Sequence, residues 1–333
     1  MNTRITTALV IAALCLSAGC KRSGIFKGRN DDAKPVHIHR FDKDLFRLIS
    51  SDATAPDERF TTEYAAMLKV IGLSIFKRQD TQTADFYDRM INYYSEPALE
   101  KLYGDALEKF DRIEPLEAEL GEAFARLHEA FPAMQIPAVY MHVSGFGQNL
   151  LVDDSLLSLS VDKYMGEDYP LYREFFHPYQ RQRMNPENIV VDYLTAWLLS
   201  EYPFRGNDRV LLERMVYEGK IKYVVGRILP HVAEETLTGY TTDALQWCKQ
   251  NEKGLWRLII ERRHLYTPDY ATTMKYFSET PSAFISDEAP GNLGAWTGLQ
   301  IVSGYMARTK VSLQELMHNR DAQDILTQSK YRP

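Results

Sequence analysis

Apolar side chains recur at helical spacing through the first part of the chain. One series is Phe60, Tyr64, Met67, Leu68 and Ile71, and a second is Leu116, Leu120, Phe124 and Leu127. Residues three or four apart lie on the same face of a helix, so each series can bury one stripe against a core. The spacing predicts four or five helices between about residues 38 and 131.

The pattern changes after Pro132. Residues 137–143 are rich in side chains that favour strands, residues 144–147 contain two glycines, and residues 155–161 alternate polar and apolar positions. Two strand-like runs with turn residues between them are typical of antiparallel pairing. We therefore expect a small antiparallel sheet near residues 136–164.

Helical spacing returns after Pro186, a residue that suits the first turn of a helix. Val190, Val191, Leu194, Trp197 and Leu198 form one stripe. Similar patterns predict helices over residues 208–225, 242–265, 293–307 and 312–318. The chain is thus expected to be mainly α with a small antiparallel β-sheet (α+β), folded as a single domain over residues 37–333 with a helical half on each side of the sheet.

The N-terminus has the pattern of a secreted lipoprotein. Arg4 is followed by an apolar run, and the small residues at positions 17–19 precede Cys20. This order predicts a signal peptide over residues 1–19, with Cys20 as the lipidated residue that anchors the chain to a membrane. An ordinary secretory signal, with Cys20 unmodified, is the alternative. The polar residues that follow, up to residue 36, are expected to form a flexible tether.

Composition and charge exclude some classes of protein. Loss of Arg4 with the signal moves the formal net charge from −6 to −7, and a mildly acidic chain is a poor nucleic-acid binder. Cys248 would be the remaining cysteine of the folded body, and its neighbours indicate a small buried side chain. After Cys20, no uninterrupted apolar run approaches the length of a membrane span. No cofactor is indicated.

The sheet followed by an amphipathic helix is the place where a zinc metallopeptidase carries His-Glu-x-x-His. The chain has no histidine between His177 and His231. Asp192, Tyr193 and Ala196 have the corresponding spacing, but tyrosine and alanine cannot act as the base and the second ligand. We therefore expect no catalytic zinc site of this type and no bound metal.

Glu218 lies in a helical context where such enzymes often have a third, carboxylate ligand. It is expected to be a surface or capping residue, or the partner of Lys220 or Lys222, and the alternative is a remnant of a lost metal centre that faces a ligand. His142 fits a sheet residue that makes a hydrogen bond. His37 and His39 are expected to be solvated.

Glycines at positions 291, 294, 298 and 304 surround a helix-like run. They would let another backbone approach one face of this helix closely. Tight core packing is one interpretation. The other is the wall of a cleft, with Asn292 and Trp296 turned toward a ligand or partner.

Several stretches of the second half resemble the gliding-motility lipoprotein GldB family of the Bacteroidetes. They are residues 211–220 with Glu218, Gly219 and Lys220; Gly239, Tyr240 and Thr241; Gln246, Trp247 and Cys248; Asn251, Glu252 and Trp256; Leu265 and Tyr266; residues 289–306; and Ser329, Lys330 and Tyr331. The resemblance implies an envelope lipoprotein associated with gliding machinery, without established catalytic activity.

A more distant resemblance is to a predicted zinc-dependent protease family that carries His-Glu-x-x-His. It implies a degenerate zincin-like (gluzincin-like) architecture, because both histidines and the catalytic glutamate are replaced here. Only Glu218 matches a ligand position, and no catalytic residue carries over.

These observations predict a non-catalytic envelope lipoprotein that acts as a structural or interaction component at the membrane. One alternative is a hydrolase with an atypical site assembled from Glu218, His142, His231 and Asn292. Another is a peptide- or glycan-binding module that uses Tyr193, Trp296 and Tyr305.

Envelope proteins and the membrane, reached through the N-terminal lipid, are the expected partners. The basic residues Lys21, Arg22 and Lys27 follow the lipidated cysteine, whereas surface export in this phylum is associated with acidic residues there. The expected location is the outer membrane, facing the periplasm.

Overall fold

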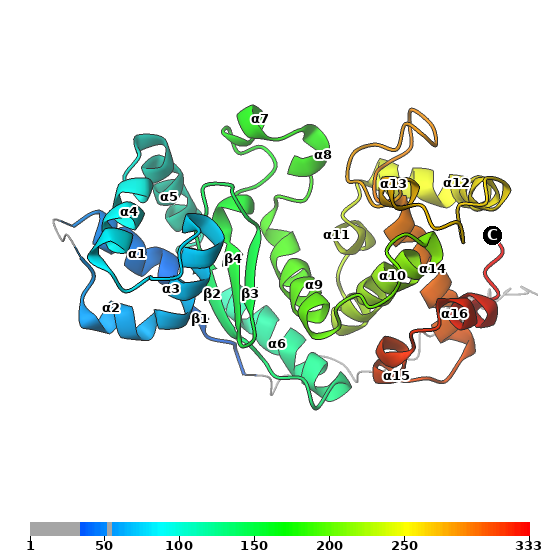
Figure 1. Ribbon diagram of the computed structural model, residues 1–333, viewed down its shortest axis with the longest axis horizontal. Coiled ribbons are helices and arrows are strands. Elements are labelled where there is room, and N and C mark those ends of the chain that lie inside the picture. Colours follow the sequence, from blue (N-terminus) through cyan, green and yellow to red (C-terminus); the bar gives the residue numbers. More distant parts are fainter. Residues whose placement is uncertain (1–33, 52–54) are drawn as a thin grey trace, which may run out of the picture.

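The computed structural model describes residues 34–51 and 55–333, and it is elongated, with the sheet near its middle (Figure 1). The helices before the sheet are α1 (Phe41–Ile49), α2 (Glu58–Glu63), α3 (Ala65–Ile71), a π-helical turn (Gly72–Phe76), α4 (Ala84–Tyr94), α5 (Pro97–Lys109) and α6 (Glu114–Ala130). There is one α-helix more than the spacing predicts, because the chain bends at Tyr64 between α2 and α3, where φ is −104° and ψ is 18°.

The sheet is mixed, which corrects the antiparallel prediction. Its strands are β1 (Ile38–His39), β2 (Ala138–His142), β3 (Leu150–Asp153) and β4 (Leu156–Ser160), in the order β1-β2-β4-β3. β1 and β4 both pair parallel with β2, and β3 pairs antiparallel with β4. The sequence pattern missed β3. Because β3 reverses the chain and a tight turn reverses it again, β4 runs in the direction of β2.

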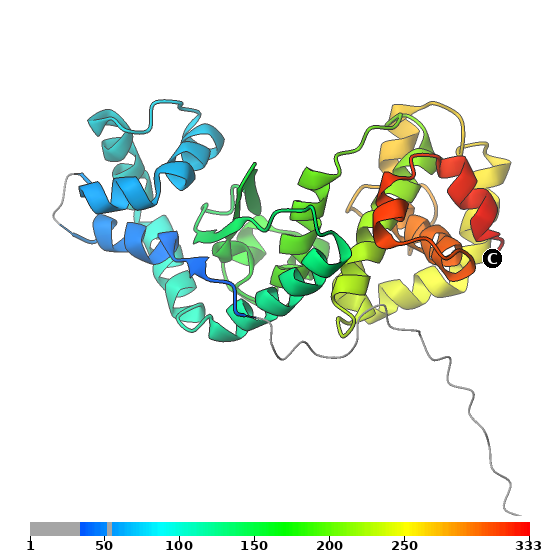
Figure 2. The same cartoon turned by 90° about the horizontal axis from the view of Figure 1, so that it is seen from below.

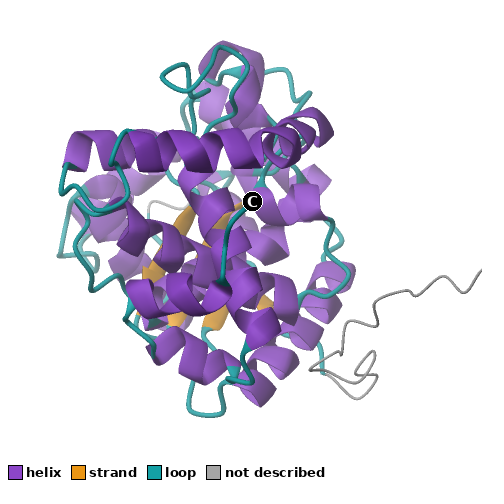
Figure 3. Ribbon diagram, turned by 90° about the vertical axis from the view of Figure 1, so that its right-hand side faces the viewer, coloured by secondary structure: helices purple, strands orange, loops and turns teal. Residues whose placement is uncertain are grey.

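Helices cover both faces of the sheet. Every residue of β4 is buried, although successive side chains of a strand point to opposite faces. α1 and α3 contact β2 and β3, and α9 (Ile189–Glu201) contacts β3 and β4. Figure 3 shows the strands enclosed by helices. This arrangement explains the apolar character of the central strands, which is typical of sheets buried on both sides.

The second half contains long helices separated by short ones. They are α7 (Tyr172–Phe175), α8 (Pro178–Arg181), α9, α10 (Leu211–Ile228), α11 (Glu234–Thr238), α12 (Thr242–Glu261), α13 (Tyr270–Lys275), α14 (Leu293–Arg308), α15 (Leu313–His318) and α16 (Ala322–Ser329), with 3-10 turns at Val161–Lys163 and Pro186–Asn188. The predicted helices correspond to α9, α10, α12, α14 and α15, so the mainly α, α+β class is confirmed.

Two of these helices, α10 and α14, cross with their backbones in contact. A Cβ atom on Gly298 would lie 1.7 Å from the carbonyl oxygen of Met215, and one on Gly219 would lie 2.2 Å from the carbonyl carbon of Gly298. Glycine at both positions therefore permits a separation that any side chain would prevent. The tight-packing interpretation holds for Gly298.

The chain enters the fold along α6. The amide of Val36 donates a hydrogen bond to the carbonyl of Glu117 at 3.0 Å, and the backbone of Lys34 passes directly over Gly121. Figure 2 shows this segment beside α6 on the lower side of the molecule. The last residues of the predicted tether thus contact the folded body. The signal peptide, Cys20 and the rest of the tether lie outside the described residues.

Within residues 34–51 and 55–333, no helix is both long enough and apolar enough to cross a membrane.

We expect Gly298→Ala to lower the free energy of unfolding by at least about 3 kcal/mol, because the added methyl group meets backbone that cannot rotate away. Gly254→Ala in α12 is the matched control, since a Cβ there has no atom within 4 Å. It should be neutral or stabilising by up to about 1 kcal/mol. Urea unfolding of both variants measures the difference, and equal stability would contradict the close crossing.

Candidate ligand-binding site

A cavity of about 530 Å³ lies where the sheet meets the C-terminal helices. Its walls come from the start of β3, the residues after β4, α8, one face of α9, the α11–α12 connection and the loop before α14. Figure 1 shows α8, α9 and α11 facing one another in the middle of the molecule. The volume is within the range of small-molecule sites.

The wall formed by α9 contains a closed polar network around Asp192. The carboxylate of Asp192 accepts a hydrogen bond from the hydroxyl of Tyr164 at 2.7 Å and forms an ion pair with Arg183 at 3.0 Å. Arg183 packs on Gly239, which has a φ of 74° and where a Cβ would lie 2.8 Å from its side chain. Both carboxylate oxygens of Asp192 are therefore already used.

Lys163 presents a cation to the cavity without such a partner. Its ammonium lies 4.1 Å from the centroid of the Phe176 ring, a favourable cation–π distance, and burial lowers its pKa. No carboxylate of the described residues lies within 4 Å of it. Glu279 also lines the cavity and acts on Lys163 only at longer range.

The neighbouring carboxylate, Asp162, cannot neutralise Lys163 directly because it holds the turn after β2. It is fully buried and accepts hydrogen bonds from the amide of Ser144 at 3.1 Å, from the amide of Phe146 at 2.7 Å and from the hydroxyl of Ser160. Burial raises the pKa of Asp162. The turn predicted at residues 144–147 is confirmed, with positive φ angles at Gly145 and Phe146.

Several uncharged polar side chains complete the lining. Asn149, Gln182, Thr195 and Asn292 all face the cavity, and their side chains make no hydrogen bond with another described residue. Asn292 begins α14 in a left-handed conformation, with a φ of 56°. These groups offer donors and acceptors to a polar ligand.

The four residues expected in a cleft lie in three different environments. Asn292 lines the cavity. Tyr193 is fully buried and its hydroxyl donates to the carbonyl of Tyr140 at 2.7 Å. Trp296 is 2% exposed, packed in the core. Neither Tyr193, Trp296 nor Glu218 is among the residues that line the cavity, and their role in binding stays a prediction.

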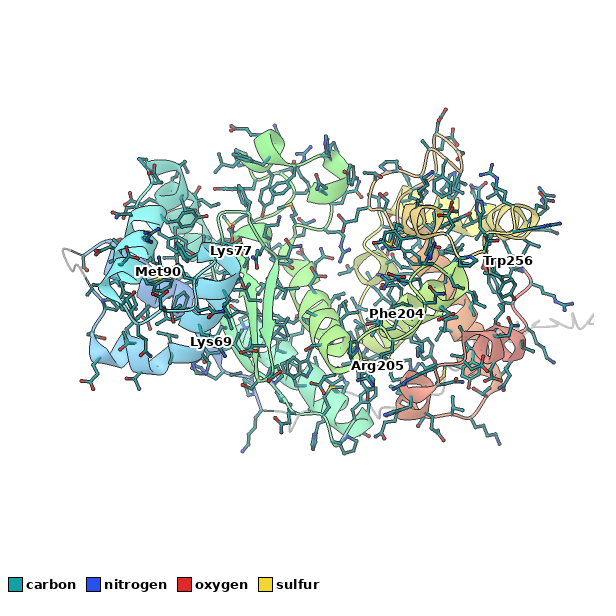
Figure 4. The ribbon with its side chains drawn as sticks, in the orientation of Figure 1. Lys69, Lys77, Met90, Phe204, Arg205 and Trp256 are labelled. Carbon is teal, nitrogen blue, oxygen red and sulfur yellow. The ribbon has the colours of Figure 1, made fainter. Side chains whose placement is uncertain are left out.

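Glu218 is fixed by an arginine and not by a nearby lysine. Its carboxylate accepts a hydrogen bond from Arg214 at 2.9 Å, and burial raises its pKa. The guanidinium of Arg214 in turn lies against three aromatic rings, with its central carbon 4.8 Å from Phe204, 5.8 Å from Tyr217 and 5.5 Å from Phe277. Figure 4 shows Phe204 beside α10.

The two lysines that the sequence offers as partners of Glu218 bond instead to main-chain carbonyls. Lys220 donates to Asn319 at 2.9 Å, and Lys222 donates to Leu237 at 3.3 Å. The predicted pairing of Glu218 with Lys220 or Lys222 is therefore wrong, and its partner is Arg214.

The histidines stay apart from Glu218. His142 is fully buried and its Nδ1 lies 2.8 Å from the hydroxyl of Ser158, as expected of a sheet residue. His37 is largely exposed, whereas His39 stacks on Tyr140 with a centroid distance of 4.6 Å. Over the described part of the chain, no group of three or more His, Cys, Asp or Glu residues could hold a metal ion.

Cys248 is buried as predicted, and burial raises its pKa to about 12, which makes it an unreactive thiol.

The sequence pattern does not single out Lys163 or Arg183. Lys163 ends the 3-10 turn after β4, and Arg183 lies in the irregular segment before α9. A charged residue at such a position is usually solvated, and only the fold brings both to one cavity. A signal in the sequence that points to this cavity is Asp192, because an acidic residue within an apolar helix needs a polar partner.

His142 predicts a pH dependence of stability. Burial lowers its pKa to about 3 in the folded protein, against 6.5 in the unfolded chain, so the unfolded state binds the additional proton between these values. The stabilising effect is complete above pH 6.5 and is lost as the pH falls toward 3. The slope from one proton is about 1.4 kcal/mol per pH unit.

Urea unfolding between pH 7 and 4 measures this effect, with His142→Gln as the comparison because glutamine does not titrate. We expect the stability of the parent chain to fall more steeply than that of the variant. Parallel profiles would contradict the buried neutral histidine.

Comparison with known proteins places the chain in one family. A search of curated proteins and a search of solved structures each returned no match. The family model described as gliding motility protein GldB matches residues 28–333, far more than half of the sequence. The chain belongs to the GldB family of gliding-motility lipoproteins.

Proposed function

We propose that this protein is a non-catalytic envelope lipoprotein that acts as a structural or interaction component at the membrane, on a metallopeptidase-like fold that has lost His-Glu-x-x-His. The lipid on Cys20 would anchor it to the outer membrane, facing the periplasm. Envelope proteins are its partners, and no cofactor takes part.

The observation that carries this proposal is the pairing of two carboxylates with arginines. In the distant resemblance to the zinc-protease family, Asp192 has the spacing of the first metal-ligating histidine, and Glu218 matches the third ligand position. Asp192 is bound by Arg183 and Glu218 by Arg214, each within 3.0 Å. A divalent cation at either carboxylate would have to displace a guanidinium and would meet its repulsion.

The cavity beside Asp192 supports a binding role. Its volume is within the range of ligand sites. Its wall contains the Lys163 ammonium, which has no carboxylate partner among the described residues, and several amide side chains that make no hydrogen bond with a described residue. Such groups can recognise a polar partner without chemistry at the bound molecule. The hydrolase alternative is supported less, because His142 and Glu218 each have a separate partner.

Metal analysis of the full-length chain, purified in detergent without chelators, tests the non-catalytic role. We expect well under one zinc per chain, with the same content in Glu218→Ala and Asp192→Asn. We also expect no cleavage of a mixed peptide pool by mass spectrometry. One zinc per chain that is lost in either variant, together with cleavage, would overturn the proposal.

The lipid anchor has its own test, because Cys20→Ala removes the thiol that would be acylated. We expect the parent chain in the membrane fraction, with an intact mass that includes the lipid. The variant should move to the soluble fraction after cell lysis. A parent chain whose mature mass contains no lipid would contradict the anchor.

A further inference from the structure

Strand β3 turns part of its backbone away from the sheet. The carbonyl of Asn149 accepts a hydrogen bond from the amide of Ser160 at 2.9 Å, which makes these two residues a hydrogen-bonded pair. In an antiparallel ladder such pairs alternate, so Leu151 bonds to β4 whereas Leu150 and Val152 do not. The amide and carbonyl groups of Leu150 and Val152 therefore point to the outer edge.

The outer edge of β3 has no hydrogen-bond partner in the described structure. β3 is the last strand of the sheet, and none of the four outward groups bonds to another described residue. β3 contains neither proline nor lysine, its one charged residue is Asp153 beside the turn to β4, and Val152 is 38% exposed. Natural proteins usually protect an edge with such residues, because a bare edge can pair with another chain.

The edge leads directly into the cavity. Asn149 and Leu150, at the beginning of β3, line it, and so does Lys163. A strand added to β3 would therefore continue from the exposed Val152 end into the space beside the Lys163 ammonium. The unpaired backbone and the unpaired cation belong to one continuous surface.

We propose that this surface binds an extended segment of a partner polypeptide, which pairs with the outer edge of β3 and places a carboxylate against Lys163. The inference rests on the proposed interaction role and names the chemistry of its partner. A terminal carboxylate at this position requires the segment to run antiparallel to β3, and an Asp or Glu side chain can reach Lys163 in either direction.

A carboxylate suits this position for a physical reason. The ammonium of Lys163 is partly removed from water and lies against the Phe176 ring. Asp162 and Glu279 act on it only through space, because neither carboxylate forms an ion pair with it. A charge in that state is stabilised by a charge-assisted hydrogen bond to an oppositely charged group. The amides of Asn149 and Asn292 can bond to the main chain of the same segment. An alternating row of donors and acceptors matches a polypeptide backbone.

The first experiment uses the full-length chain in detergent and a pool of random heptapeptides with free C-termini, with the same pool amidated as a comparison. We expect the recovered peptides to bind and to slow hydrogen exchange of the Leu150 and Val152 amides. Loss of binding on amidation identifies the terminal carboxylate as the ligand. Retained binding with enrichment of Asp or Glu identifies a side chain.

Two pairs of variants test the contacts. Val152→Pro removes an outward amide and leaves the ladder to β4 intact, and Val152→Thr keeps that amide. Lys163→Gln removes the cation, and Glu279→Gln removes the carboxylate that competes for it. We expect about a tenfold loss of affinity in Val152→Pro, which loses one backbone hydrogen bond. In Lys163→Gln, which loses a charge-assisted hydrogen bond, we expect at least about a tenfold loss. Val152→Thr should bind normally, and Glu279→Gln should bind as tightly or more tightly.

Thermal unfolding of each variant shows whether it is folded. A pool from which no peptide binds, or peptides whose affinity is unchanged in Val152→Pro and Lys163→Gln, would overturn the inference. Neutral peptides that bind equally well when amidated would overturn the role of Lys163. Cleavage of bound peptides would instead contradict the non-catalytic function and leave the binding mode standing, so the two failures are distinguishable.

Discussion

The contact of backbones between α10 and α14 is the constraint on which the second half of the structure depends. Gly219 and Gly298 have no side chains, so the backbones of the two helices touch at the crossing. This contact fixes the position of the residues on each helix relative to those on the other. Asn292, at the beginning of α14, then lies in the cavity wall. Arg214 and Glu218 on α10 pair with each other and do not line the cavity. A change at the crossing would move both together, since protein interiors are closely packed and transmit strain.

The electrostatics of the site follow from arginines that occupy the space beside carboxylates. A carboxylate on an apolar helix such as α9 needs a counter-charge, and a guanidinium provides one with fixed geometry. The Arg183 side chain packs against the backbone of Gly239, and the Arg214 guanidinium packs against three aromatic rings. Both are therefore preorganised. Lys163 differs because its nearest carboxylate, Asp162, is engaged by backbone amides and a hydroxyl. The remaining positive charge faces the cavity.

The sequence was informative where periodicity is long and local. The stripes at residues 60–71 and 116–127 and after Pro186 correspond to helices, and the glycine pattern indicated the close crossing. The sheet was harder, because β1 has two residues and β3 has four, too few for a periodic signal. A prediction that lacks β3 makes β4 antiparallel to β2, whereas the two strands are parallel. Of the site, only Asn292 was recognised as a residue of the cavity wall, since Lys163 and Arg183 reach the cavity through irregular backbone.

The position of the chain entry bears on how an anchored domain could use its cavity. The backbone of residues 34–36 lies along α6, at the lower side of Figure 1, whereas α7 and α8 lie on the upper side beside the cavity. Gly121 keeps this entry tight, because a side chain there would collide with the backbone of Lys34. A tether that begins on the α6 side therefore starts on the side of the molecule opposite to α7 and α8.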